Sequence, residues 1–268
     1  MRVFWSALLL ASVLLTEPVW SAEMRVLRVV TEATNPPFEF KDEQGSLVGF
    51  DLDLLEAMAR AGNFTIELAE VPFAQILPML LAGDADVGAA GFFITTARKE
   101  QVAFSEQYIR GGLTAAIGPI YVDSIQSARD LEGKNICVHT ASLAEQLAKS
   151  IKRAQVLSKD TNEEVAQSFN DGECAVAINE RLVMLYHIKT GTLQDAVLLP
   201  DLLSHHELGF ALREDDKALK ELIDGSLEQI RKDGTYSEIF NKWFSVDVQE
   251  NRVHIKNDAD TDDRAVAE

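Results

Sequence analysis

The segment GFFITTARKEQVAFS, residues 91–105, places an arginine just beyond the end of a predicted strand. The preceding residues 81–90, LAGDADVGAA, predict a helix end, a glycine turn and a short buried strand. Residues 94–96, Ile-Thr-Thr, then begin a helical turn that carries Arg98. A strand end, free helix amides and a guanidinium that converge on one point can bind an anion, most simply a carboxylate. The alternative is a salt bridge from Arg98 to a neighbouring acid, and this segment alone leaves both open.

Strands and helices alternate on the N-terminal side of this segment. We predict strands at residues 24–31 and 64–68, and helices at residues 52–61 and 73–81. The first strand ends in a proline-containing loop at residues 32–38, and open α/β sheets place their ligands in such loops. The order β-α-β-α-β therefore predicts a parallel sheet with crossover helices.

The same pattern begins again after an apolar segment at residues 113–119, which predicts a strand crossing into a second unit. In this unit we expect strands at residues 135–139 and 172–179, and helices at residues 143–151 and 163–169. Residues 206–213 alternate as a strand and could cross back. Helices at residues 216–233 and 236–244 then complete the pattern.

The two ends of the chain differ from this α/β pattern. Residues 1–22 combine a positive start, an apolar run too short to span a bilayer and small residues at a cleavage point, which predicts a signal peptide. A buried N-terminal helix is the alternative. We expect a protein that is not membrane-embedded, is free in an exported compartment, most simply a bacterial periplasm, and is a monomer. Residues 247–268 predict a disordered acidic tail.

Charge and cysteine content limit the possible functions. The formal net charge of −18 argues against a nucleic-acid-binding protein, because such a protein needs a basic face. The two cysteines, Cys137 and Cys174, favour a disulfide in an exported protein, although two buried thiols are the alternative. Two thiols alone do not form a zinc site, and no histidine spacing adds ligands. We expect neither a metal nor a cofactor.

Several short motifs follow one another in an order that is similar to a known family. They are NPPFEF at 35–40, LVGFDLDL at 47–54, LAGDAD at 81–86, ITTARK at 94–99, DLEGK at 130–134, DGTY at 233–236 and KWF at 242–244. From about Leu27 to Phe244 the chain resembles the extracellular solute-binding proteins of amino-acid ABC importers, solute-binding family 3, in the polar-amino-acid-binding group.

This resemblance implies an α/β protein of the type II periplasmic-binding fold. Two Rossmann-like lobes, joined by two crossing strands, would close on a solute. The first lobe would comprise residues 23–112 plus 207–246, and the second residues 113–206.

The resemblance also implies a set of solute-binding residues. Arg98 matches the arginine that holds the α-carboxylate of an amino acid, and the backbone amide of Gly91 would assist it. Ser142 lies in the second-lobe loop where a helix begins, and Asn179 or Glu180 lies where the family binds the α-ammonium. The full predicted set is Glu32, Asn35, Phe73, Ala90, Gly91, Phe93, Arg98, Ser142, Asn179 and Glu180.

Four segments depart from the family pattern, and one of them is Ala141-Ser142-Leu143, where the family has a glycine and threonines. Phe93 replaces a hydroxyl residue, Asn35 replaces an aromatic residue, and Ala90-Gly91 replaces a serine pair. The carboxylate-binding arginine is retained, whereas the ammonium site is spread over Asn179 and Glu180. The solute could therefore be an ordinary α-amino acid or another small carboxylate.

The resemblance implies a binding protein, not an enzyme, that captures the solute and delivers it to the permease of an ABC transporter. One alternative is an exported dehydratase that acts on a cyclic carboxylic acid, with Glu180 or Glu32 as general acid. Another is a ligand-sensing or accessory binding protein that acts through a separate partner.

Overall fold

The computed structural model describes residues 24–244, and its first sheet has five strands in the order β5-β1-β6-β14-β7. At its centre, β1 (Arg25–Thr31) is parallel to β5 (Phe64–Glu70) and to β6 (Val87–Ala89). The short strands β14 (Ala211–Leu212) and β7 (Ala103–Phe104) complete it through antiparallel pairing. A parallel centre with crossover helices is the arrangement that the β-α-β-α-β order predicts.

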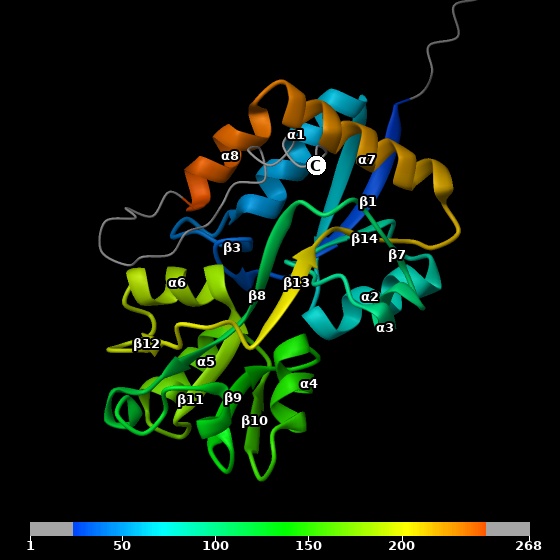
Figure 1. The fold of residues 1–268 in the computed structure, drawn as a ribbon. Coiled ribbons are helices and arrows are strands. Elements are labelled where there is room, and N and C mark those ends of the chain that lie inside the picture. The colour runs from blue at the N-terminus through cyan, green and yellow to red at the C-terminus, as the bar shows by residue number, and fades with distance from the viewer. Residues whose placement is uncertain (1–23, 245–268) are drawn as a thin grey trace, which may run out of the picture.

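Helices cover both faces of the first sheet. Neighbouring strand residues point to opposite faces, so Val29 packs in the core formed with α1 (Phe50–Gly62), α7 (Lys217–Lys232) and α8 (Thr235–Phe244). Val30 packs instead with Ile76 and Leu80 of α2 (Phe73–Ala82). In Figure 1, α1, α7 and α8 lie together in the upper part of the molecule.

Two glycines near helix ends have different roles. Gly83 ends α2 with a φ of 76°, and its N–H donates to the last turn, as predicted from the sequence. Gly62, predicted to close α1, lies inside that helix, and Asn63 takes the left-handed conformation with a φ of 53°. A Cβ on Gly62 would lie 2.2 Å from Ser226 Oγ, so the glycine allows α1 to approach α7 closely.

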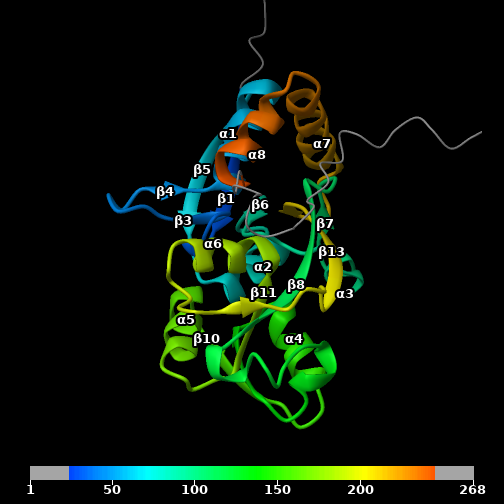
Figure 2. The ribbon, with the colours of Figure 1, turned by 60° about the vertical axis from the view of Figure 1, so that its left-hand side comes forward.

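The second sheet has six strands. Their order is β10 (Gln155–Lys159), β9 (Asn135–His139), β11 (Val176–Glu180), β8 (Ile109–Ile117) and β12 (Val197–Leu198), with β13 (Ser204–Leu208) also paired to β8. Its helices are α4 (Leu143–Ser150), α5 (Asn162–Asn170) and α6 (Arg181–Lys189); α4 and α5 lie in the lower part of Figures 1 and 2, and α6 lies near the middle.

Shorter elements connect these layers. They are β2 (Thr34–Asn35), β3 (Glu39–Lys41) and β4 (Leu47–Val48) in a small antiparallel sheet, α3 (Thr96–Lys99), and 3₁₀ turns at Pro119–Tyr121 and Ala128–Leu131.

The chain crosses between the two sheets twice, once from β7 to β8 and once from β13 to β14. The strands β8 and β13 pair with each other and run side by side between the upper and lower parts of the molecule (Figures 1 and 2). These features confirm the α/β fold with two crossing segments. Both predicted lobe boundaries, at residues 112 and 206, fall inside these paired strands, so the exact division into lobes remains a prediction.

The second crossing differs from the single strand predicted at residues 206–213. It is interrupted, because β13 ends at Leu208 and β14 begins at Ala211. At the break, the N–H of Gly209 donates to the carbonyl oxygen of Phe92 at 3.0 Å. A Cβ on Gly209 would lie 2.8 Å from Ile94 Cδ1, so the small residue lets the crossing pass close to residues 92–94.

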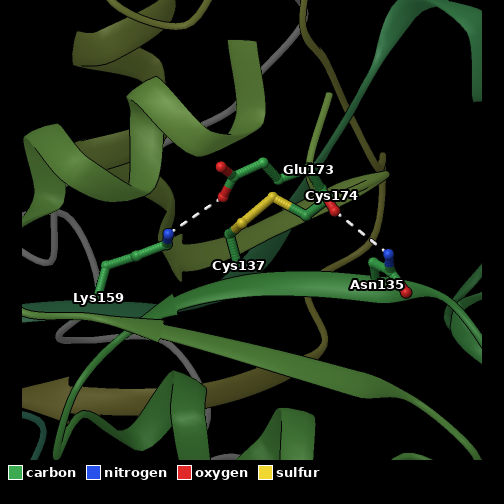
Figure 3. Close-up of a disulfide and its surroundings, with 5 residues drawn as sticks. All are labelled: Asn135, Cys137, Lys159, Glu173 and Cys174. Atoms are coloured by element: carbon green, nitrogen blue, oxygen red, sulfur yellow. Dashed lines mark hydrogen bonds and ion pairs between the residues drawn. A yellow bond between two sulfur atoms is a disulfide. The ribbon is translucent and has the colours of Figure 1, made fainter. Parts of the chain in front are cut away.

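Cys137 and Cys174 form a disulfide, which confirms the predicted pairing. Figure 3 shows it next to the Lys159–Glu173 ion pair, whose closest atoms are 3.1 Å apart. Cys137 lies on β9, but Cys174 precedes β11, which begins at Val176 and not at residue 172 as predicted. The bridge therefore ties β9 to the turn that leads into its neighbouring strand.

The predicted signal peptide at residues 1–22 and acidic tail at residues 247–268 lie outside the described residues. Across residues 24–244, none of the helices combines the length and apolar character needed to cross a bilayer.

Candidate solute-binding pocket

All ten residues predicted to bind solute line one cavity between the two sheets, with about 440 Å³ of empty space that includes part of its opening. The lining also includes residues that the sequence did not indicate, namely Phe38, Leu113, His139, Leu143 and Ala144. The structure therefore brings the predicted set together. That these residues bind a solute remains a prediction.

Arg98 projects into this cavity from α3, whose first turn is fixed by the Thr95 side chain accepting from the Arg98 N–H. Its side chain donates to the carbonyl oxygen of Phe93 at 3.0 Å, and its guanidinium carbon lies 5.0 Å from the centre of the Phe92 ring. The residue is only 7% exposed, and burial lowers the pKa of its guanidinium to about 10.

No carboxylate within residues 24–244 forms an ion pair with Arg98. The local alternative considered from the sequence, a salt bridge to a neighbouring acid, is therefore absent from the described part of the chain. A buried cation without a counter-ion is unfavourable, so this side of the cavity is suited to an anion from outside.

The start of α4 faces the cavity from the second sheet. Ser142 caps this helix, because its Oγ accepts from the Glu145 N–H at 3.1 Å and donates to the His139 carbonyl at 2.6 Å. Its hydroxyl is thus engaged in the fold. The following residues, Leu143 and Ala144, line the cavity in the first helical turn, where backbone N–H groups lack partners within the helix.

The predicted role of the Gly91 amide differs from what the structure shows. Its N–H donates to Asp51 Oδ2 at 2.9 Å and is therefore not free to assist a carboxylate. Asp51 reaches it from α1 and also accepts from the Tyr108 hydroxyl at 2.9 Å. Gly91 itself has a φ of 55°, and a Cβ there would lie 3.0 Å from Asn35 Nδ2, so the position favours glycine for its backbone conformation.

Asn179 and Glu180, the two candidates for binding the α-ammonium, both line the cavity. Glu180 Oε2 caps α6 by accepting from the N–H groups of Leu182 and Val183, the latter at 3.2 Å. Its Oε1 is buried and makes no hydrogen bond within the described residues. Burial raises the pKa of the Glu180 carboxyl to about 7.

A second acid, Glu32, meets a histidine across the cavity. Glu32 Oε1 lies 3.3 Å from His139 Nε2, and Thr34 Oγ1 also donates to this carboxyl. Burial raises the pKa of Glu32 to about 7 and lowers the pKa of His139. Within the described chain, no three His, Cys, Asp or Glu residues are grouped so that they could hold a metal ion.

Aromatic rings form one wall of the cavity. Phe73 stacks on Phe92 with ring centres 4.9 Å apart, and its ring centre lies 5.3 Å from that of His139. Phe93 lines the cavity and lies 5.2 Å from the His206 ring, measured between centres. These rings are apolar, whereas Arg98, Glu32 and Glu180 supply the charged groups of the cavity.

Comparison with known proteins places this architecture in a family. The family model of the bacterial extracellular solute-binding proteins, family 3, matches residues 27–246. A probable histidine-binding protein of Neisseria gonorrhoeae is 30% identical over 227 residues, which covers 82% of this chain and 84% of the relative. The L-cystine-binding protein TcyJ of Escherichia coli K12 is 27% identical over 227 residues, covering 84% of this chain and 85% of the relative.

Two solved structures extend the comparison. An ancestral arginine-binding protein bound to arginine is 38% identical, with a TM-score of 0.78, covering 83% of this chain and 100% of that chain. An ancestral amino acid-binding protein, AncCDT-1, described as a precursor of cyclohexadienyl dehydratase, is 33% identical, with a TM-score of 0.76, covering 82% of this chain and 95% of that chain. The chain described here belongs to the bacterial extracellular solute-binding proteins of family 3.

Proposed function

We propose that this protein captures an amino acid outside the cytoplasm and delivers it to the permease of an ABC importer. The observation that carries the proposal is the buried Arg98 guanidinium, which lines the cavity without a carboxylate partner in the described part of the chain. A solute carboxylate would supply the missing counter-ion through charge-assisted hydrogen bonds. The relatives named for histidine and cystine, and the neighbour bound to arginine, support an amino acid as the solute.

The charges of the cavity favour an amino acid with a basic side chain. Arg98 offers one cation, whereas Glu180 and Glu32 offer two acids. If the α-carboxylate takes Arg98 and the α-ammonium takes Glu180, Glu32 is left for a second basic group. A neutral side chain would leave Glu32 with only His139, whose charged form burial disfavours.

The proposed mechanism is closure of two lobes, each built on one sheet. The first sheet and its loops contribute Glu32, Phe73 and Arg98, and the second contributes Ser142 and Glu180. A solute that contacts both groups binds the closed arrangement more tightly than the open one and so shifts the population toward it. The permease would then recognise the closed form.

A thermal-shift screen tests this function. The purified protein is heated with arginine, lysine, histidine, neutral and acidic amino acids, and cyclic carboxylic acids, and each bound compound is recovered afterwards. A true solute raises the melting temperature with dose, by mass action. We expect arginine to stabilise the protein more than citrulline, which has a similar length but an uncharged side chain. No stabilisation by any amino acid would contradict the proposal.

An exported dehydratase is the second candidate, and Glu180 is the observation that favours it. Its carboxyl lines the cavity, has one oxygen without a hydrogen bond in the described residues, and has a pKa of about 7. A protonated carboxyl could donate its proton to a leaving hydroxyl as the carbon–oxygen bond breaks and water leaves, while the electron pair of a neighbouring carbon–hydrogen bond forms the new double bond and the proton released there restores the acid form of Glu180. The screen distinguishes the candidates, because an enzyme returns a compound lighter by one water and Glu180→Gln abolishes that conversion. A binding protein returns the compound unchanged.

A further inference from the structure

Three asparagine side chains form a hydrogen-bonded chain across the two sheets, beside the cavity. Asn162 Nδ2 donates to Asn35 Oδ1 at 3.1 Å, and Asn179 Nδ2 donates to Asn162 Oδ1 at 2.8 Å. Asn35 belongs to β2 in the N-terminal part of the chain, whereas Asn162 begins α5 and Asn179 lies on β11 of the second sheet. The Asn162–Asn35 bond therefore joins the two halves of the molecule directly.

The two ends of the chain fix the orientation of all three amides. At one end, the backbone N–H of Glu180 donates to Asn179 Oδ1 at 2.7 Å, and a backbone N–H can only donate. At the other end, Asn35 Nδ2 donates to Glu39 Oε1 at 2.9 Å. Each amide thus accepts on its oxygen and donates from its nitrogen. Turning any one of them over would break bonds on both sides.

Asn162 is the central member of this chain and does not line the cavity. It is 3% exposed, while Asn35 and Asn179 on either side of it both line the cavity. A buried amide that lost its partners would cost more than the net value of the bonds. The Asn162 side chain therefore makes both of these hydrogen bonds only while the two sheets keep their present arrangement.

We propose that Asn162 is a positioning residue, which holds the closed arrangement of the two sheets through Asn35 whether or not a solute is bound. The bond joins the neutral side-chain amides of Asn162 and Asn35, and neither is one of the aromatic or charged residues of the cavity. The Asn162 side chain itself does not line the cavity, although Asn35 and Asn179 do, so its bond should favour closure to a similar extent for different solutes. The expected change in solute affinity rests on the proposed function, whereas the expected change in the distance between the two halves does not.

The consequence for binding is a uniform change in affinity. If binding requires the closed form, the apparent dissociation constant rises as the closed fraction falls, by a factor that does not depend on the solute. Loss of the bonds of Asn162 should weaken binding roughly three- to tenfold. A residue that contacts the solute would instead change the ratio of affinities between solutes.

The chain supplies a matched control on the same helix. Asn170 ends α5, and its amide also makes two hydrogen bonds, donating to the Thr192 carbonyl at 2.8 Å and accepting from the Gln194 N–H at 3.0 Å. Both partners lie in the same half of the molecule as Asn170. Asn162→Ala and Asn170→Ala thus each remove one asparagine and two bonds, but only the first removes a bond between the halves.

A further variant, Asn162→Asp, isolates the crossing bond. It keeps an oxygen to accept from Asn179 and loses the nitrogen that donates to Asn35. The first turn of a helix favours an acidic residue, but burial of a carboxylate at a site that is 3% exposed opposes this, so the melting temperature of the variant is measured together with its affinity. Binding that weakens by more than any change in the melting temperature explains would separate closure from stability.

The experiment measures both properties. Calorimetric titration gives the affinity of each variant for arginine, lysine and histidine. Electron-spin distance measurements, with labels attached through Glu56→Cys and Lys152→Cys, report the separation of the two halves in solute-free protein. Both positions are exposed, on α1 and after α4 respectively. We expect Asn162→Ala and Asn162→Asp to lengthen the distances and to weaken all solutes by one common factor, and Asn170→Ala to do neither.

Other results would overturn the proposal. Distances in Asn162→Ala equal to those in Asn170→Ala would show that the bond does not hold the closed form. Affinity losses that differ between solutes would show that Asn162 acts by shaping the pocket. If the starting protein binds no amino acid, the proposed function fails, while the solute-free distances still decide the role of Asn162.

Discussion

Glu32 Oε1 lies 3.3 Å from His139 Nε2, so an acid next to the first sheet and a histidine of the second meet inside the cavity. His139 Nε2 also lies 3.0 Å from the Asp160 carbonyl oxygen, and Glu163 is the nearby acid that further raises the pKa of Glu32. Burial disfavours the charged form of both partners. We therefore expect a cationic group of the solute to replace His139 as the partner of Glu32.

Solute affinity should depend on pH through Glu32. Its pKa of about 7 means that the carboxylate form, which binds a cation, becomes populated as the pH rises through 7. Affinity for arginine should increase between about pH 6 and pH 8, by at most about tenfold per pH unit for each proton released. Calorimetric titration across this range measures the slope.

Glu180 also has a pKa of about 7, so both acids contribute to the pH dependence of affinity. The variant Glu32→Gln removes the contribution of Glu32 alone. The Glu32→Gln protein should show a flatter pH dependence for arginine than the starting protein. Citrulline, which has no side-chain cation, should show little difference between the two proteins. The same slope for arginine in both proteins would exclude Glu32 as the group that pairs with the solute cation.

The stability of the solute-free protein should fall as pH rises. Burial raises the pKa of Asp51 to about 7 and the pKa of Glu39 well above its usual range. The fold thus favours their protonated forms, a stabilisation that is fully present below their unfolded-state pKa values near 4 and is lost for Asp51 as pH rises through 7. The melting temperature should fall between about pH 5 and pH 8, because Glu32 and Glu180 act in the same direction as Asp51, while buried His187, whose pKa is lowered to about 4, opposes part of the fall.

Asp51→Asn should flatten this pH dependence, because an amide oxygen can still accept from Gly91 and Tyr108 without becoming charged. Asp53→Asn is the control, since Asp53 lies on the same helix but pairs at the surface with Lys242 at 2.6 Å. Calorimetric melting at several pH values compares the three proteins. If the melting temperature of Asp51→Asn changes with pH as steeply as that of the starting protein, Asp51 is not the group that titrates.

Removal of the disulfide should lower stability but not affinity. The bridge closes a separation of 37 residues, and a loop of this size stabilises a fold by about 2–4 kcal/mol. It lies within the second sheet, and neither cysteine lines the cavity. The double variant Cys137→Ala, Cys174→Ala should unfold at lower denaturant concentration and bind solute as tightly as before. A large loss of affinity in still-folded protein would contradict this separation.

Local sequence signals predicted several elements closely. The strand at residues 135–139 has the predicted bounds, and α2 ends at its glycine turn as expected. Among the longer elements, β10 (Gln155–Lys159) and α6 (Arg181–Lys189) were missed. None of the residues of β10 is buried, because it is an edge strand, so it lacks the alternation that marks a half-buried strand. The cap of α6 is Glu180, which the sequence indicated only as a pocket residue.

Pocket residues at loop positions could be found from the family resemblance, whereas others depend on contacts between distant segments. Leu113 lies within the apolar run of β8, and only the pairing of that strand decides which side chains face the cavity. Asn162 meets Asn35 across 127 residues, and no local pattern indicates that contact. The Gly91 amide binds Asp51 from 40 residues away, which is why its predicted role differs from the structure.

The most direct measurement compares arginine with argininamide, in which a neutral amide replaces the carboxylate, in the starting protein and in Arg98→Ala. Because Arg98 is buried without a carboxylate partner in the described residues, its removal should cost about 2–5 kcal/mol of arginine binding, which is about 30-fold or more in affinity. The starting protein should strongly prefer arginine to argininamide, and Arg98→Ala should lose that preference while remaining folded. An Arg98→Ala protein that binds arginine with unchanged affinity, or that still rejects the amide equally, would contradict the claim that this pocket holds the solute by its carboxylate.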